Sequence, residues 1–327
     1  MSPGERQGSA RAGSNGRASA VPDSASSYYG QPVIKEPVWT WEIPCYLFTG
    51  GLAGASAGLA LLGGVRDNET LARRAWSVAM FGVTASPVLL IMDLGKPMRF
   101  LNMLRMLKVT SPMSVGSWIL VVSGSSTAVA VLHAHTGLLP GLARGARPVA
   151  AIMGLPLSTY TAALVANTAI PVWHEAHREL PYLFAAGAAA SAGAAAVALT
   201  PAPDSAMARR LALVGSVAEL AAVKLMERRL GEVGEPYEHG HAGRLTRLAK
   251  GLTATGAGVL ALEAGRWRPA AIAGAGMIFS GAFAERWSVF RAGFQSASSP
   301  RAVIGPQRER IRTGAARGAS VGSSLPC

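Results

Sequence analysis

Residues 39–58 read Trp-Thr-Trp-Glu-Ile-Pro-Cys-Tyr-Leu-Phe-Thr-Gly-Gly-Leu-Ala-Gly-Ala-Ser-Ala-Gly. After Glu42 the chain carries no charge as far as Val65. Since about 20 apolar residues rising about 1.5 Å each cross the hydrocarbon core of a bilayer, this run is long enough to span one. Trp39 and Trp41 precede it, as amphipathic rings do at the headgroup level, and its glycines would let other helices approach closely. The stretch predicts a first transmembrane helix that begins beside a polar site.

The composition favours a polytopic membrane protein. The 327-residue chain is 50% hydrophobic and 15% charged, with a mean hydropathy of +0.29, whereas a soluble domain carries about 25% charged residues. The formal net charge of +13 would suit nucleic-acid binding, but much of the basic excess lies in the two tails and in loops beside apolar runs. This distribution indicates control of topology and contact with anionic lipid, and we expect no nucleic-acid partner.

Seven more apolar runs follow the first and predict an all-α integral membrane protein, an eight-transmembrane-helix bundle. They cover about 75–93, 113–134, 148–171, 180–200, 209–226, 251–265 and 269–285. Run 251–265 is the weakest candidate for a membrane span, because it is short and contains Glu263. A bundle of seven spans is therefore the alternative. Continuous rather than alternating apolar residues disfavour a β-barrel. We expect residues 1–27 to form a disordered tail, 28–295 the membrane domain and 296–327 a disordered basic tail.

Counting Lys and Arg in alternate connections orients the predicted bundle. The face that holds the N-terminus carries more of them, including those of segments 93–108 and 224–250. Because positively charged loops stay inside, we expect both termini to be cytoplasmic and the protein to be integral to the cytoplasmic membrane. The same face would hold the segments with the most reactive side chains, which are 93–118, 166–181 and 284–297.

Two of these segments contain candidate site residues. Asp93 ends the second run beside apolar residues, where a carboxylate costs free energy unless it is paired or protonated, and Arg99 is the expected partner. His174 and His177 follow the fourth run, and their alternative role is that of solvated loop residues. Trp173 beside them has the alternative role of an aromatic anchor at the membrane surface.

Ionisable residues inside the predicted spans are candidates for proton movement. Glu219 and Lys224 lie in the sixth run and Glu263 in the seventh, each among apolar neighbours. Glu219 and Lys224 are not spaced as i, i+4 partners on one helix face. We therefore expect Glu219 and Glu263 to belong to a proton path, with an ion pair as the structural alternative.

Four motifs, in this order, resemble those of the NrfD/polysulfide-reductase membrane-subunit family. They are Trp-Glu-Ile-Pro-Cys-Tyr-Leu-Phe-Thr-Gly-Gly at 41–51, Asp-Leu-Gly-Lys-Pro-Met-Arg-Phe at 93–100, Ser-Pro-Met-Ser-Val-Gly-Ser-Trp at 111–118, and Tyr160-Thr161. The resemblance covers about residues 28–300 and includes the count of eight helices. It implies a membrane anchor that exchanges electrons between a partner iron–sulfur subunit and membrane quinone, with menaquinone favoured. The partner would itself be attached to a catalytic subunit, such as a molybdopterin enzyme.

Quinone chemistry requires a slot open to lipid, hydrogen-bond donors for the carbonyls and a route for protons. The resemblance matches Tyr160 to the family's quinone-contacting Tyr in the fourth helix; the alternative is a core Tyr bonded to a backbone carbonyl. Ala162 stands where the family often has Gly, which would narrow the slot. The quinone-binding candidates are Glu42, Tyr46, Asp93, Arg99, Tyr160 and His174.

Other cofactors lack ligands in this sequence. The six His lie at span ends or in loops, with no facing pair at mid-membrane depth, so we expect no haem. Cys45 and Cys327 have no partner at metal-ligand spacing, so we expect no iron–sulfur cluster or zinc. Electrons would then come from the partner subunit, and this chain would be the quinone-reactive part of the complex rather than its substrate-converting enzyme.

Two other functions stay open at this point. The short seventh run and the prolines at 87, 156 and 171 are a faint version of the broken helices of transporters. A purely structural anchor would hold a soluble enzyme at the membrane without touching quinone. The sequence also leaves open whether protons are translocated alongside the quinone chemistry.

Overall fold

Helices form all the regular structure in the part of the chain that the computed structural model describes, which is residues 34–94, 98–105, 107–263 and 267–299. Eight of them are long: α1 (Glu42–Val65), α2 (Glu69–Asp93), α4 (Pro112–Thr136), α5 (Pro140–Ala166), α7 (Leu180–Leu199), α8 (Ala206–Leu230), α10 (Gly240–Glu263) and α11 (Arg268–Ser298). Each coincides with one predicted apolar run. The predicted N-terminal tail, and the C-terminal tail beyond Ser299, lie outside the described residues.

The last helices are longer than the runs that predict them. The structure begins α10 at Gly240 rather than near 251, and it ends α11 at Ser298 rather than near 285. The additional turns of α10 carry Arg244, Arg247 and Lys250. A search for apolar residues stops at such side chains, whereas the backbone hydrogen bonds of a helix continue through them.

Five helices are long and apolar enough to cross a membrane by length and composition: α1, α2, α4, α5 and α7. The described residues thus contain as many long helices as the predicted spans, but α8, α10 and α11 do not pass this hydropathy criterion, so eight spans stay a prediction. In α8 the cause is charge, since it contains Arg209, Arg210, Glu219, Lys224, Glu227, Arg228 and Arg229.

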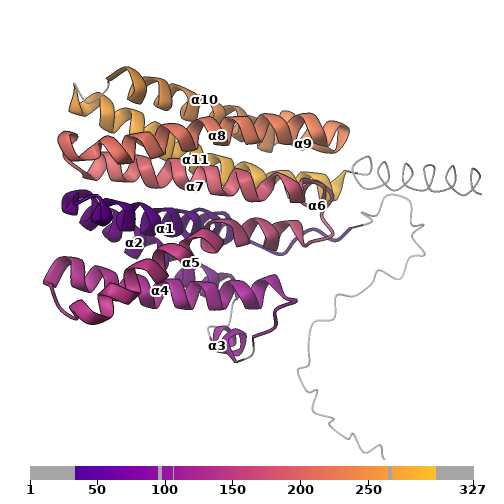
Figure 1. Cartoon of the computed structure of the whole chain (residues 1–327). Coiled ribbons are helices and arrows are strands. Elements are labelled where there is room, and N and C mark those ends of the chain that lie inside the picture. Colours follow the sequence, from indigo (N-terminus) through magenta and orange to yellow (C-terminus); the bar gives the residue numbers. More distant parts are fainter. Residues whose placement is uncertain (1–33, 95–97, 106, 264–266, 300–327) are drawn as a thin grey trace, which may run out of the picture. The chain divides into compact units, whose positions relative to one another are not determined.

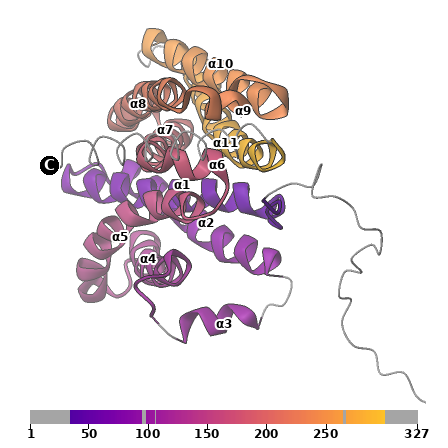
Figure 2. The ribbon, with the colours of Figure 1, turned by 90° about the vertical axis from the view of Figure 1, so that its right-hand side faces the viewer.

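The long helices pack in two groups of four. Figures 1 and 2 show α1, α2, α4 and α5 in one group and α7, α8, α10 and α11 in the other. The two groups meet where α7 packs against α1 and α5, and where α11 packs against α1. One buried apolar cluster crosses this boundary, with Tyr46 of α1, Phe184 of α7 and Phe290 of α11 among its members.

The short helices gather at one end of the helix groups. Successive long helices alternate in direction, so α3 (Arg99–Leu104), α6 (Pro171–Glu175) and α9 (Glu235–Glu238) lie at the end where α1 begins (Figure 1). We call it the α6 end. At the opposite end, Asn68 Nδ2 donates to the Asp204 carbonyl at 2.9 Å and Arg268 Nη1 to the Val197 carbonyl at 3.0 Å. The segments that the sequence placed on one face therefore do share an end.

Trp173 of α6 connects the two groups. It is fully buried, its ring stacks on Trp39 at 5.6 Å between centroids, and its Nε1 donates to the Val289 carbonyl of α11 at 2.7 Å. A Cβ on Gly293 would lie 2.1 Å from its ring, so the indole rests directly on the α11 backbone. The alternative of a surface aromatic anchor is therefore wrong for Trp173, whereas Trp41 is 52% exposed.

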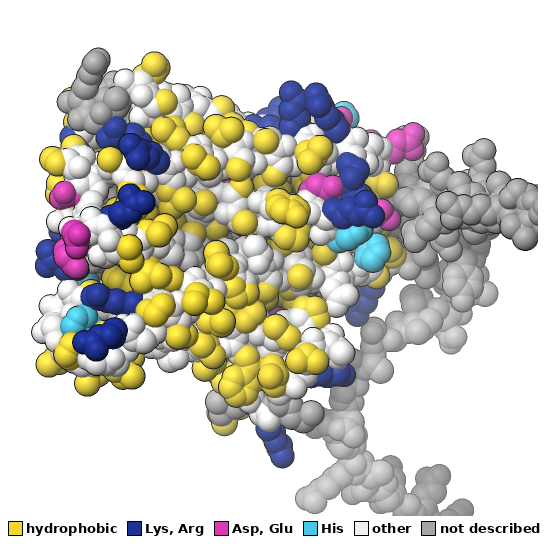
Figure 3. All heavy atoms as spheres, in the orientation of Figure 1, with side chains coloured by type: hydrophobic (Ala, Val, Ile, Leu, Met, Phe, Trp, Pro, Cys, Tyr) yellow, Lys and Arg dark blue, Asp and Glu magenta, His cyan; other side chains and the backbone are white. Residues whose placement is uncertain are grey.

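The surface carries an apolar band between two charged rims. In Figure 3, hydrophobic side chains cover the middle of the visible face, and Lys and Arg gather toward its two ends. The helices outside the five apolar ones contribute to the exposed apolar surface, through Val214, Val217 and Leu225 of α8, Leu248 and Leu262 of α10, and Ile272 of α11. Large exposed apolar surfaces are rare on soluble monomers, and a band of this kind is typical of a membrane protein.

Glycine allows a close helix crossing between α1 and α5. A Cβ added to Gly54 of α1 would lie 2.2 Å from the Gly154 carbonyl oxygen of α5, and one on Gly154 would lie 2.4 Å from the Gly54 carbonyl oxygen. The backbones of α1 and α5 therefore touch at this point, as small residues permit between membrane helices.

We expect Gly54→Ala to destabilise the protein by about 1–3 kcal/mol, because the added methyl forces α1 and α5 apart. Gly58→Ala is the matched control, since nothing lies within 4 Å of the position of its Cβ. It should be neutral or gain up to about 1 kcal/mol from helix propensity. Thermal unfolding of both variants in one detergent measures the difference, and equal midpoints would contradict the close crossing.

Candidate functional site

Glu42 and Asp93 meet at the mouth of α1. The Thr40 hydroxyl hydrogen-bonds the Glu42 carboxylate and lies 3.4 Å from Asp93 Oδ1, to which the Thr40 backbone N–H also donates at 3.4 Å. Glu42 stands in the first turn of α1, where the helix dipole favours a negative charge. The structure thus joins the beginning of α1 to the end of α2 through two carboxylates and one hydroxyl.

Tyr46 and Tyr160 lie in the buried cluster next to this mouth. Tyr46 comes about 6 Å after the start of α1 and Tyr160 about 9 Å before the end of α5, at 1.5 Å per residue. Both side chains are buried and belong to the same apolar cluster. The Tyr160 ring presses on α4, because a Cβ on Gly116 would lie 2.1 Å from its Cε2 atom.

The Tyr160 hydroxyl is buried and makes no hydrogen bond with any described residue. The alternative of a core Tyr bonded to a backbone carbonyl therefore does not describe it. The Thr161 hydroxyl is also buried, and no described residue is its hydrogen-bond partner. Successive residues point about 100° apart on a helix, so the Tyr160 and Thr161 side chains lie on different sides of α5. A buried hydroxyl without a partner costs about 1–3 kcal/mol, which a ligand oxygen at the site would relieve.

Two predicted site residues are not brought into this cluster. His174 is exposed at the α6 end, with its ring 6.1 Å from that of His177, so it does not join the buried tyrosines. This position agrees with the alternative prediction for His174, that it is a solvated loop residue. The Arg99 side chain lies outside the described residues, so the expected ion pair between Asp93 and Arg99 stays a prediction.

A second polar cluster is buried inside the group of α7, α8, α10 and α11. Glu219 of α8 is 2% exposed, and Glu285 and Arg286 of α11 are 5% and 2% exposed. Arg286 forms an ion pair with Glu285. A Cβ on Gly187 of α7 would lie 3.0 Å from Glu219 Oε1 and 3.1 Å from Arg286 Nη2, so both side chains reach the same point of α7.

Some polar atoms of this cluster have hydrogen-bond partners among the described residues, and others do not. Arg286 Nη2 donates to the Phe184 carbonyl at 2.7 Å, and its guanidinium lies 4.0 Å from the centre of the Phe184 ring, a cation–π contact. Both Glu219 oxygens and Glu285 Oε1 are buried with no hydrogen-bond partner among the described residues. Unpartnered buried carboxylate oxygens are rare and indicate a bound water, ion or proton.

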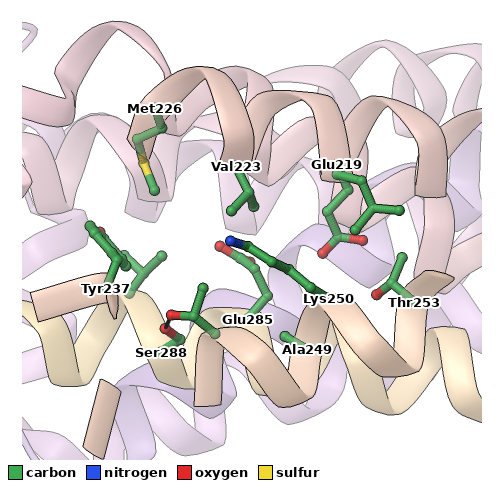
Figure 4. A pocket seen from close by; sticks show the side chains of 12 residues that line it. Glu219, Val223, Met226, Tyr237, Ala249, Lys250, Thr253, Glu285 and Ser288 are labelled. Atoms are coloured by element: carbon green, nitrogen blue, oxygen red, sulfur yellow. Dashed lines mark hydrogen bonds between the residues drawn. The ribbon is translucent and has the colours of Figure 1, made fainter. Parts of the chain in front are cut away.

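These carboxylates line a cavity of about 20 Å³, which is large enough for one water. Figure 4 shows the Glu219 carboxylate pointing from α8 toward α10 and α11, with the Lys250 side chain lying across the cavity. The Lys250 ammonium donates to Glu227 Oε2 at 2.7 Å, and its side chain is 36% exposed. Tyr237 closes the side toward α9, and its hydroxyl is buried without a partner among the described residues.

The structure refines the predicted proton path. Glu219 is buried as expected, whereas Lys224 lies on the exposed side of α8. Glu263 ends α10 away from the α6 end, and its side chain lies outside the described residues. The sequence reading missed Glu285 because the last run was ended at that residue. A Glu-Arg pair inside a long helix of small and apolar residues was the available signal.

The comparison with protein families gives a match. A family model described as polysulphide reductase, NrfD, matches residues 31–226. The matched segment contains α1 to α7 and most of α8, and with them both carboxylates of the mouth, Tyr160 and Glu219. No curated protein matches the chain.

Proposed function

Because the chain belongs to the NrfD polysulphide reductase family, we propose that it is the quinone-reactive membrane subunit of an oxidoreductase complex. It is a membrane protein, and members of the family are generally membrane anchors of such complexes. The proposal adds that the chain exchanges electrons between an iron–sulfur subunit docked on it and quinone in the membrane. In this arrangement the iron–sulfur subunit connects it to a catalytic subunit.

All eight long helices cross the membrane in this proposal. Most of the charges that lower the hydropathy of α8 lie near its two ends, as Arg209 and Arg228 do, or inside the helix group, as Glu219 does; Lys224 is exposed six residues before the end of α8, from which a long side chain can extend toward the headgroups. The exposed face of α8 between these ends is largely apolar. With eight crossings both termini lie on one side, and in this proposal that side is the cytoplasm, because Lys and Arg are more frequent there; the membrane is the cytoplasmic membrane.

The observation that carries the proposal is the buried Tyr160 hydroxyl, which has no hydrogen-bond partner in the part of the chain that the structure describes. It lies about 9 Å inside the α6 end of α5, in a buried apolar cluster, and it can donate to a carbonyl oxygen. A quinone supplies an apolar ring with two such oxygens, so its chemistry fits the residues present. Tyr46 offers a second phenol in the cluster, and Glu42 and Asp93 at the mouth can pass protons from water.

Electrons and protons must balance in this reaction. Reduction of a quinone to a quinol takes two electrons, which the partner's iron–sulfur group supplies, and two protons. The roles of this chain are to bind the headgroup through Tyr160, to exclude water with the surrounding apolar cluster and to hold protons at the Glu42–Asp93 mouth. In the reverse direction the same residues accept the protons of a quinol.

Tyr160→Phe tests the proposal in the purified complex. We expect kcat/KM for a water-soluble menaquinone analogue to fall about tenfold, because the loss of one hydrogen bond of about 1.4 kcal/mol is a tenfold loss. Tyr182→Phe on α7 is the control, since this Tyr is 75% exposed, and it should be unchanged. Glu42→Gln should slow quinone reduction, because it removes a carboxylate that holds protons for the quinone.

Unchanged quinone kinetics in both Tyr160→Phe and Glu42→Gln would contradict the proposed pocket. An iron–sulfur partner that co-purifies with the chain but shows no reactivity with quinone would instead make the chain a structural anchor. Rapid reoxidation of the iron–sulfur group by the analogue is the readout, so a defect in the catalytic subunit does not affect the result.

A further inference from the structure

The buried cluster of α8 and α11 does not balance its charges when both carboxylates are ionised. Glu219 and Glu285 then carry two negative charges, and Arg286 beside them carries one positive charge. An uncompensated charge in a buried, low-dielectric site costs several kcal/mol. One further positive charge makes the cluster neutral, and the three carboxylate oxygens that lack a partner among the described residues mark where it would bind.

The neighbouring groups do not supply this charge. Lys250 of α10 is the nearest other cation of the cavity lining, and its ammonium is already paired with Glu227 of α8. Tyr237 of α9 is buried, and burial, together with the Glu285 and Glu227 charges, raises the pKa of its phenol, so it stays neutral. From α7, the groups that face Arg286 are the backbone and ring of Phe184 and the backbone at Gly187.

We propose that Glu219 and Glu285 share one exchangeable proton, held with one water in the cavity between α8, α10 and α11. The size of the cavity favours a proton and a water over a hydrated metal ion, because about 20 Å³ holds a single water. Two carboxylates that share a site cannot both ionise easily, so the proton belongs to the pair rather than to either residue.

The proton exchanges with the α6 end along Lys250 and Glu227. The Lys250 side chain lines the cavity (Figure 4), and its ammonium donates to Glu227 in the last turn of α8. Glu219 itself lies about 17 Å from that end of α8. Lys250, which is partly exposed, lines the cavity beside the buried acid, and its ion pair with Glu227 leads from there toward the end of α8.

Infrared spectroscopy of the full-length protein in lipid nanodiscs tests the shared proton. At neutral pH we expect a protonated-carboxyl C=O stretching band that shifts to lower frequency in D2O. Glu219→Gln should abolish this band, because the remaining Glu285–Arg286 pair is neutral. Glu285→Gln should abolish it equally, because Glu219 and Arg286 are then neutral. Glu232→Gln, at an exposed carboxylate, is the control and should leave the band intact.

Each other outcome contradicts part of the proposal. Loss of the band in Glu219→Gln with an unchanged band in Glu285→Gln would place the proton on Glu219 alone and overturn the sharing. A band that survives both substitutions, or no band in the wild type, would overturn the site. Ionised-carboxylate bands that respond to sodium would identify a metal cation in place of the proton.

The exchange route has its own variant. Lys250→Met keeps the length of the aliphatic chain but removes the ammonium. We expect the rate at which the band shifts after transfer to D2O to fall at least about tenfold. An unchanged rate would overturn this route. Neither measurement needs quinone or a redox partner. Failure of the proton site therefore leaves the quinone proposal standing, and failure of the quinone proposal leaves the proton site standing.

Discussion

Arg286→Met is expected to destabilise the protein by about 3–5 kcal/mol, because it leaves the buried carboxylates without their cation. Arg286 is 2% exposed, pairs with Glu285, donates to the Phe184 carbonyl and stacks on the Phe184 ring. Methionine fills much of the same volume but replaces none of these interactions. The midpoint of thermal unfolding in detergent measures the loss.

A second substitution separates charge from volume. In Glu285→Met/Arg286→Met both partners of the ion pair are apolar, and buried pairs replaced in this way are often neutral or stabilising. We therefore expect the double variant to recover most of the stability lost in Arg286→Met. Arg291→Met on the exposed side of α11 is the control and should change little. A double variant as unstable as Arg286→Met would show that packing, not charge, explains the loss.

Trp173→Ala is the other change with a large expected effect, a loss of about 3–5 kcal/mol. The indole is fully buried between Trp39 and Phe290, and α11 approaches it so closely that only Gly fits at position 293. Alanine would leave a cavity where α6 packs on α11. Unfolding midpoints measure the effect, and limited proteolysis should locate new cleavage near residue 173.

Trp173→Phe separates the contribution of the hydrogen bond from that of packing. Phenylalanine retains most of the packing but loses the hydrogen bond to the Val289 carbonyl, so we expect a loss of about 1–2 kcal/mol. Trp267→Ala is the control, because that ring is 61% exposed. If Trp173→Ala were as stable as the control, α6 would not connect the two helix groups in the way described.

The sequence predicted the elements of this fold well, for a physical reason. A membrane helix must satisfy its own backbone hydrogen bonds, so a long apolar run specifies a helix almost without tertiary information. The eight runs accordingly coincide with α1, α2, α4, α5, α7, α8, α10 and α11. Helix ends were less predictable, as in α10, because polar turns continue a helix without appearing in a hydropathy pattern.

Side-chain partners were harder to predict than helices. The juxtaposition of Glu42 and Asp93 depends on how α1 packs against α2, and it is bridged by Thr40, which no motif had indicated. Lys224 and Glu219 looked alike in sequence, but one is exposed and the other buried, because they lie on different faces of α8. Only the packing of α11 against α7 and α8 brings Glu285 and Arg286 to Glu219.

Electron exchange with quinone is the central claim, and a direct measurement follows one redox group. The tagged full-length chain is purified from its native membranes with the proteins bound to it, and the absorption of reduced iron–sulfur groups is followed while a menaquinone analogue is added. We predict that an iron–sulfur protein is present and is reoxidised by the analogue, and that reoxidation is about tenfold less efficient in Tyr160→Phe. A preparation without an iron–sulfur protein, or one whose iron–sulfur groups do not respond to the analogue, would contradict the account.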